Sequence, residues 1–173
     1  MSFLHNITEE FKLESELTRR YLIQVPFDKF DFKPSEKSEP LGRLAIHIAE
    51  ILAWWSSVIH SDGLDFTNFT PKDIQTKEEL LIYFDTLLKE ALASLSAIQE
   101  DDLYGNWSMS NEGEVYFTLP KIQVLRIFCL NHLIHHRSQL GVYLRLHNIS
   151  VPATYGPSAD DFDVILKRKF DSD

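Results

Sequence analysis

Residues 41–60 read LGRLAIHIAEILAWWSSVIH, and this stretch decides the fold. Its apolar side chains recur at the helical period and also cover most of the circumference, so the helix that they form must be largely buried. The richest face carries Leu44, Ile48, Ile51, Leu52, Trp55 and Ile59. The most apolar part is about a dozen residues long and contains His47 and Glu50, which is too short and too polar to span a bilayer. The stretch therefore predicts a buried helix in a chain that does not enter a membrane.

The flanking sequence predicts three further helices around this one. Apolar side chains follow the helical period at 8–25, at 76–99 and, over the longest run, at 119–148. Ser38 with Pro40 predicts the entry into the buried helix, because proline tolerates a first helical turn and a serine before it can cap. Thr76 with Glu79 has the spacing of a capping box.

The stretch 106–118 interrupts this helical pattern before the last helix. Residues 106–110 and 114–118 have the composition of short extended pieces around a turn at 111–113. After the last helix, 151–163 is rich in Pro, Gly and Asp, and we expect it to pack back as an extended tail. The fold class is therefore all-α, an up-down four-helix bundle with a short hairpin or long loop before the last helix. No linker divides the chain, so 1–173 is expected to be a single helical-bundle domain.

Charge and cysteine content limit the partners and the compartment. The formal net charge is −9, from 26 acidic and 17 basic residues that do not cluster, which disfavours nucleic acid and anionic membrane surfaces. Small molecules or other subunits are the expected partners. Cys129 is the sole cysteine, so no internal disulfide forms. The first residues resemble no secretory signal, and we expect a cytoplasmic location.

Three histidines carry the candidate chemistry. His132 and His136 are four residues apart, which places them one turn apart on a single helix face. That face continues through apolar residues, so both imidazoles point toward the core, where unpaired polar groups are costly. His47 interrupts the apolar surface of the buried helix in the same way. Together His47, His132 and His136 predict a site for one divalent metal ion, with ordinary hydrogen-bonded histidines as the alternative.

Other residues near this motif have weaker claims. His135 competes with His136, since a spacing of three from His132 also allows a common face. Glu50 follows His47 by three residues, the reverse of the Glu-x-x-His order in di-iron bundles, and we expect a solvent-facing or outer-sphere carboxylate. Cys129 is expected to be a small buried hydrophobe. The remaining assignments are core or bundle-edge aromatics for Trp54 and Trp55, and surface histidines for His5, His60 and His147.

The sequence resembles the DinB-like (DinB/YfiT-type) family at three places. Residues 32–49, FKPSEKSEPLGRLAIHIA, resemble the second-helix signature, and residues 131–145, NHLIHHRSQLGVYLR, resemble the last-helix signature. Residues 151–160, VPATYGPSAD, are similar to the usual closing segment. One departure is Ser138, where the family often has glycine.

This resemblance implies a bundle with a three-histidine site formed by His47, His132 and His136, and often a homodimer. The ion would be zinc or nickel, with iron or manganese also compatible with nitrogen ligands. Some relatives act as low-molecular-weight thiol transferases and others look like hydrolases, so we expect a metal-dependent enzyme of one of these types. The alternative is a non-catalytic metal-binding or sensing bundle. Gln139, Arg137 and Tyr155 are candidates for orienting a substrate or the ligands, with a surface salt bridge as the alternative for Arg137 and packing for Tyr155.

Overall fold

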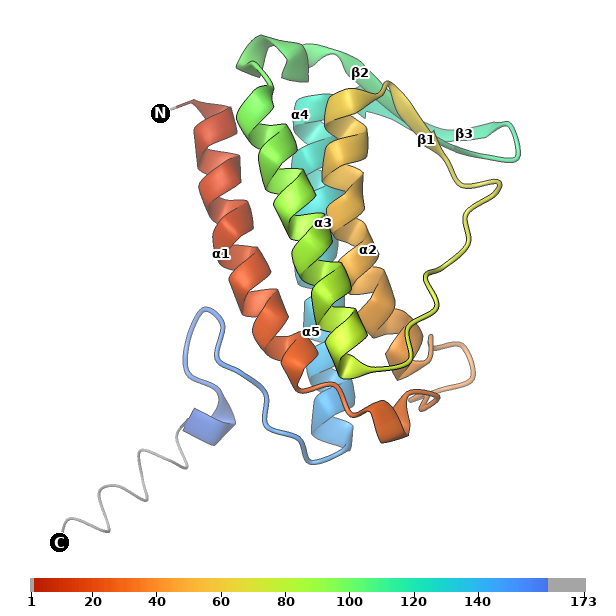
Figure 1. The fold of residues 1–173 in the computed structure, drawn as a ribbon, viewed down its shortest axis with the longest axis vertical. Coiled ribbons are helices and arrows are strands. Elements are labelled where there is room, and N and C mark those ends of the chain that lie inside the picture. The colour runs from red at the N-terminus through yellow and green to blue at the C-terminus, as the bar shows by residue number, and fades with distance from the viewer. Residues whose placement is uncertain (1, 162–173) are drawn as a thin grey trace, which may run out of the picture.

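The structure is a computed structural model that describes residues 2–161, a mostly helical fold with a small sheet (Figure 1). Its elements in chain order are α1 (Phe3–Ile23), a 3₁₀ helix (Phe27–Lys29), α2 (Leu41–His60), β1 (Gly63–Asp65), α3 (Lys77–Ala97), a second 3₁₀ helix (Glu100–Tyr104), β2 (Asn106–Asn111), β3 (Glu114–Pro120), α4 (Lys121–Val124), a π-helical segment (Leu125–Asn131) and α5 (His132–Leu146). The last three follow one another without a break. None of the helices in the described part of the chain has the length and apolar character needed to cross a membrane.

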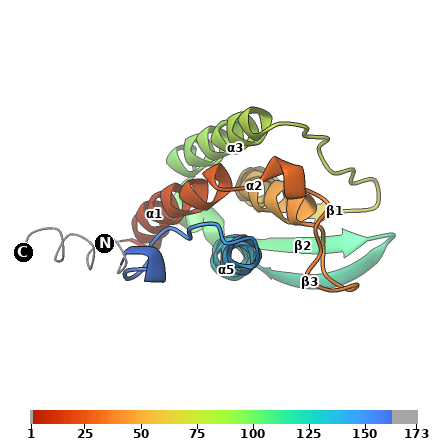
Figure 2. The same ribbon diagram turned by 90° about the horizontal axis from the view of Figure 1, so that it is seen from below.

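Four long helical segments lie side by side, but they do not alternate in direction (Figures 1 and 2). α1 runs parallel to the continuous run of the π-helical segment and α5, since Glu10 pairs with Arg126 of the first and Glu14 with Arg137 of the second. α2 and α3 also run parallel, because His60 and Ser94, both close to the C-terminal ends of these helices, are hydrogen-bonded at 2.9 Å. The simple up-down order expected from the sequence is therefore wrong.

The connection between α2 and α3 explains this difference. An extended segment as long as 61–76 reaches about 50 Å, whereas a helix of 20 residues, such as α2, is about 30 Å long. The chain therefore has enough length to return along α2 before α3 begins. Helix spacing in the sequence carries no information about which way such a connection runs.

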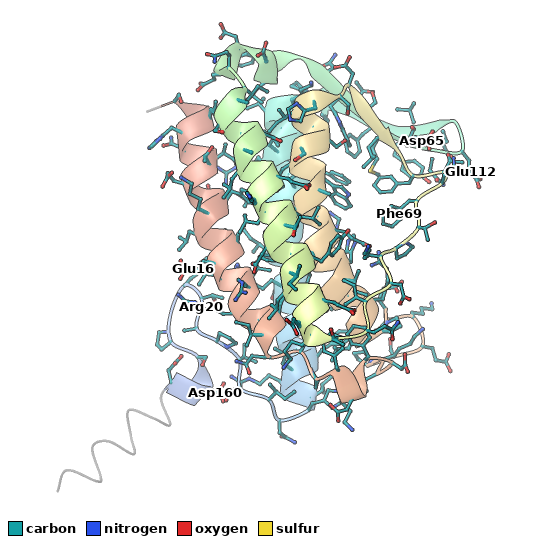
Figure 3. All side chains as sticks on the ribbon, viewed as in Figure 1. Glu16, Arg20, Asp65, Phe69, Glu112 and Asp160 are labelled. Carbon is teal, nitrogen blue, oxygen red and sulfur yellow. The ribbon has the colours of Figure 1, made fainter. Side chains whose placement is uncertain are left out.

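The expected hairpin is present, and a third strand extends it. β2 and β3 pair antiparallel around Glu112 and Gly113, whose φ values of 51° and 80° are those of a tight hairpin turn. β1 pairs parallel with β2, in the order β1-β2-β3, so the mostly helical fold also contains a small three-stranded sheet that the all-α fold class did not include. β1 has only three residues, too few for the alternating pattern of a strand to be recognised in the sequence. Figure 3 shows Asp65 and Phe69, from the connection, beside Glu112 at the tip of the hairpin.

The helix boundaries follow the sequence except at the N-terminus of α1, and the capping residue of α2 differs from the prediction. α2 has the predicted bounds, and Thr76 Oγ1 caps α3 by accepting from the Glu79 N–H at 3.2 Å. α1 begins at Phe3 rather than near residue 8, because Ser2 caps it by accepting from the His5 N–H. Ser38 does not cap α2. Its hydroxyl bonds to Ser35, and the N-cap position is Pro40.

α2 lies in the core, as its sequence predicts. Every residue of its predicted apolar face is buried, and the Trp55 ring stacks on Phe11 of α1 with centroids 3.9 Å apart. Trp54 is buried too, at the edge nearer α5. The segment 151–161 returns across α1 and α5, where Tyr21 donates to the Pro152 carbonyl. Residues 162 and 163 of the expected tail lie outside the described residues.

Candidate metal centre

His47, His132 and His136 meet between α2 and α5. Their ligand atoms lie within 4.8 Å of one another, and no other group of three or more His, Cys, Asp or Glu in residues 2–161 has this property. The Nε2 of His132 is 3.4 Å from that of His47 and 2.6 Å from that of His136. The three Nε2 atoms therefore face a common point, as the sequence predicts for these residues.

The opposite side of two of the rings is held by an acceptor, and a carboxylate lies near the third. Gln139 Oε1 accepts from His136 Nδ1 at 2.7 Å, and the carbonyl of Phe128 accepts from the ring of His132. His47 Nδ1 lies 3.7 Å from the Glu50 carboxylate. Metal-bound histidines almost always have such a partner on the second nitrogen, which fixes the tautomer and leaves the other lone pair for the ion.

Burial keeps two of these rings neutral. It lowers the pKa of His132 and of His136 to about 4, and the neighbouring histidines contribute to both shifts in the same direction. With the proton of each neutral ring on Nδ1, two bare Nε2 lone pairs face each other at 2.6 Å. Such a pair is repulsive unless a cation lies between them. The donor set thus fits a divalent ion, whose nitrogen ligands sit about 2.0–2.1 Å away in the case of zinc.

Glu50 is a buried carboxylate beside His47 rather than a solvent-facing one. It is 3% exposed, accepts from Arg43 Nη2 at 2.6 Å and accepts from the Lys72 backbone N–H at 3.2 Å. Burial by itself would raise the pKa of Glu50, but the contacts with His47 and Arg43 outweigh it and hold the pKa below its ordinary value. Glu50 therefore stays ionised beside His47. Arg43 was not predicted from the sequence, although its position one turn before His47 was a usable signal.

The π-helical segment places an aromatic wall behind the histidines. Phe128, inside that segment, stacks on Trp54 with centroids 4.5 Å apart, and both rings contact His132. Short π-helical segments are rare and occur frequently at functional sites. The two rings cover this side of the centre.

The other side of the centre is a cavity of about 650 Å³ between α2, α5 and the segment before α2. His47, His136 and Gln139 form one part of its lining, and Lys37 and Arg43 form another. Ligand pockets in proteins commonly have volumes of about 300–1,000 Å³. The three-histidine centre is thus accessible to a small molecule.

The remaining histidines are not part of this centre. His135 is exposed, and its ring packs edge-on against that of His136 with centroids 4.9 Å apart. The ranking of His136 above His135 as a candidate ligand agrees with this geometry. His5 and His60 are exposed, as predicted. His147 is half-buried against Phe32, so the surface assignment is wrong for that residue.

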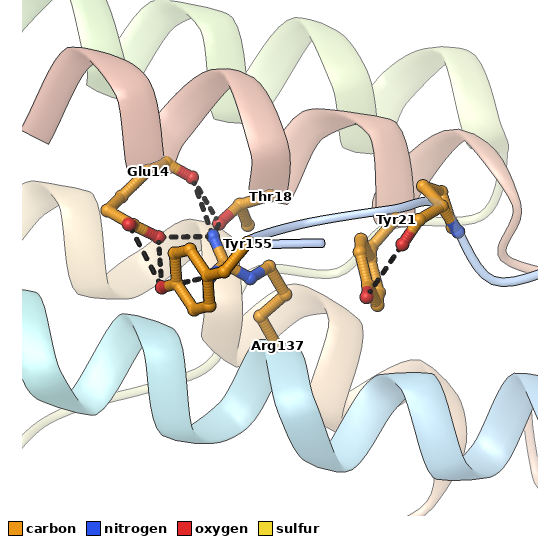
Figure 4. Close-up of polar contacts among 6 residues, drawn as sticks. Glu14, Thr18, Tyr21, Arg137 and Tyr155 are labelled. Carbon is orange, nitrogen blue, oxygen red and sulfur yellow. Dashed lines mark hydrogen bonds and ion pairs between the residues drawn. The ribbon is translucent and has the colours of Figure 1, made fainter. Parts of the chain in front are cut away.

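Arg137 does not face the candidate centre. Its guanidinium is buried and pairs with the buried Glu14 carboxylate at 2.6 Å (Figure 4). Tyr155 donates to Glu14 and accepts from Arg137 at 2.8 Å, while Thr18 accepts from Arg137 at 3.3 Å. This network ties the returning segment to α1 and α5. Arg137 is neither a surface salt bridge nor a substrate-orienting group, and Tyr155 is a structural contact.

Cys129 is a buried small side chain, as predicted. It is fully buried, and burial raises the pKa of its thiol above the ordinary range. The thiol stays protonated and shut off from the cavity, so it is neither a ligand nor a nucleophile in this structure.

Comparison with known families decides the relationship that the motifs suggest. The sequence profile of the DinB family matches residues 1–167. The chain belongs to the DinB family. The resemblance to that family is thereby confirmed. No curated protein matches the chain.

Solved structures of DinB-like proteins share the fold. The DinB-like protein YjoA of Bacillus subtilis superimposes with a TM-score of 0.68 at 21% identity, over 86% of this chain and 97% of its own. A DinB-like protein of Bacillus cereus gives 0.65 at 17% identity, over 87% and 97%. At these identities the likeness concerns the fold alone.

Proposed function

We propose that this DinB-family chain holds one divalent transition metal ion on His47, His132 and His136, inside a four-helix bundle, and acts as a metal-dependent enzyme. The supporting observation is the convergence of three Nε2 atoms at the wall of a cavity, with acceptors on the other side of His132 and His136 and the Glu50 carboxylate near His47. Structural zinc sites are closed by four protein ligands. Here three histidines leave a position for a substrate.

Zinc or nickel is the proposed ion, with iron or manganese as alternatives, because imidazole accepts several first-row metals. Such an ion supplies Lewis acidity, which activates a water molecule or a thiol. The protein contributes neutral rings, and Trp54 and Phe128 cover one side of the centre.

The proposed reactions are transfer to a low-molecular-weight thiol or hydrolysis. In either case the nucleophile has to enter through the cavity, because the one cysteine of the chain is buried away from it. Both activities therefore depend on the three histidines and on access along the Lys37 and Arg43 side.

The test is activity of protein loaded with Zn²⁺ or Ni²⁺, assayed with low-molecular-weight thiols plus an electrophilic acceptor and with simple esters and amides. We expect a rate above that of the metal-free protein in one of the two assays. His47→Ala and His136→Ala should abolish it, and His135→Ala, on the exposed side of α5, should not. If loaded protein equals metal-free protein in both assays, the enzyme proposal fails and a metal-binding or sensing role replaces it.

A cytoplasmic location, a homodimer and a single domain over 1–173 are further parts of the proposal. The homodimer and the single domain can each be tested by one measurement. A mass twice that of the 20.1 kDa chain in sedimentation equilibrium supports the dimer, and a monomer mass contradicts it. One cooperative unfolding transition supports the single domain.

A further inference from the structure

The connection 61–76 from α2 to α3 lies outside the helices and is attached at few points (Figure 1). Its strand β1 pairs with β2. Residues 68–73, which follow, are all exposed. The structure of residues 2–161 gives this stretch a single hydrogen bond to another segment, from the Lys72 N–H to Glu50 Oε1 at 3.2 Å. Segments with so few contacts open locally at a low free energy.

Glu50 joins this connection to the candidate metal centre. Its Oε1 accepts from the Lys72 N–H, while its Oε2 accepts from Arg43 Nη2 at 2.6 Å and lies 3.7 Å from His47 Nδ1. The carboxylate is buried and ionised, so each donor around it counts for more than it would in water. The Lys72 N–H therefore helps to hold the carboxylate beside His47.

A second contact leads from the connection to the same centre. The Phe66 ring packs edge-on against Trp54 with centroids 5.9 Å apart. The centroid of Trp54 lies 5.1 Å from that of His132 and 5.6 Å from that of His47. The exposed stretch thus lies between two contacts, at Phe66 and at Lys72, that both lead to the histidines.

We propose that the connection 61–76 has an attached and a detached state, and that metal binding at the three histidines favours the attached state. In the attached state two donors hold the Glu50 carboxylate beside His47 Nδ1, and in the detached state only Arg43 does. An ion on Nε2 draws electron density from the ring and makes Nδ1–H a stronger donor. The ion therefore gains more where the carboxylate is held in place.

Coupling of this kind is reciprocal, so the attached connection raises the metal affinity by the same factor by which the metal favours attachment. The connection then acts as a strap whose closure reports that the centre is loaded. This inference rests on the metal binding in the proposed function and not on the proposed reaction.

Hydrogen exchange of the Lys72 amide, followed by NMR with and without saturating Zn²⁺, tests the effect of metal on the connection. We expect the exchange to slow at least about fivefold with Zn²⁺, the lower end of typical coupling factors. The Val151 N–H, which is bonded to Asp160 in the returning segment, is the control, and its exchange rate should not change.

The affinity for Zn²⁺, measured by competition with a chelator, tests the reverse effect on three variants. Lys72→Pro removes the hydrogen that Glu50 accepts and should weaken Zn²⁺ binding by a similar factor. Lys72→Ala keeps this N–H and should bind Zn²⁺ like wild type. Thr70→Pro removes an N–H that has no acceptor among residues 2–161 and should also match wild type. The two proline variants are matched, because each forms a Pro–Pro pair with Pro71.

The outcomes separate this inference from the proposed function. Zn²⁺ binding with unchanged exchange at Lys72 defeats the coupling and leaves the proposed metal site intact. An equal loss of affinity in Lys72→Pro and Thr70→Pro also defeats it, because the loss then belongs to proline and not to the Glu50 contact. If Lys72→Pro does not fold, the exchange measurement on wild-type protein decides by itself. No Zn²⁺ binding by wild type defeats the proposed function and the coupling together.

Discussion

Gln139 lies one turn after His136 on α5, and its Oε1 accepts from Nδ1 of that ring at 2.7 Å. This bond holds His136 Nε2 toward the other two rings. Loss of such an outer partner typically costs 10–100-fold in metal affinity. We therefore expect Gln139→Leu to lower the affinity for Zn²⁺ by about that factor, measured by competition with a chelator. Gln139→Glu keeps an acceptor and should retain or raise the affinity, and an unchanged affinity in Gln139→Leu would contradict the role.

Removal of a single ring should empty the centre. Wild type is expected to carry about one metal ion per chain, and His132→Ala should carry almost none, because the aromatic wall offers no replacement ligand. Elemental analysis after dialysis measures this. His135→Ala should match wild type, and metal retained in His132→Ala would exclude the proposed ligand set.

The metal-free protein should lose stability as the pH falls from about 6.5 to about 4. His132 and His136 have pKa values lowered to about 4 by burial, whereas unfolding restores values near 6.5. In that interval the unfolded chain binds more protons, so the free energy of unfolding decreases as protons are added. Tm measured against pH tests this. A His132→Asn/His136→Asn double variant should show a weaker slope, and equal slopes would contradict the burial of these rings.

The Glu14–Arg137 pair should dominate the attachment of the returning segment. Glu14→Gln leaves a buried guanidinium without its counter-charge, a change that typically costs about 3–5 kcal/mol. Urea unfolding of Glu14→Gln measures the loss. Glu16→Gln removes an exposed ion pair with Arg20 on the same helix (Figure 3), and its effect should stay below about 1 kcal/mol. Similar losses in both variants would refute the buried network.

Gly42 is needed where the segment before α2 crosses the helix. A Cβ at this position would overlap the Phe30 ring, while the Gly42 N–H donates to the Phe30 carbonyl at 2.8 Å. Gly42→Ala should therefore destabilise the protein by about 1–3 kcal/mol, as overpacking does. Gly156→Ala, with open space around its Cβ, is the control and should be close to neutral. Thermal unfolding of both variants decides, and a neutral Gly42→Ala would disprove the close approach.

Local patterns in the sequence were sufficient to predict the helices and the histidines that lie on their inner faces. The apolar circumference of 41–60 required a buried helix, and the spacing of His132 and His136 placed both rings on one face. Burial and helical periodicity are properties of neighbouring residues, so they can be read from a single sequence. His47, which interrupts the apolar surface of 41–60, was predicted in the same way as the partner from a second helix.

Features that depend on contacts between distant segments of the chain could be seen only in the tertiary structure. The parallel course of α2 and α3 follows from the path of 61–76, and β1 exists only because that path runs beside the hairpin. The pairing of Arg137 with Glu14, 123 positions away, and the exposure of Arg43 to a cavity shared with Lys37 and His136 arise from packing. A side chain's partner is set by the free energy of the whole folded arrangement, and no local pattern encodes it.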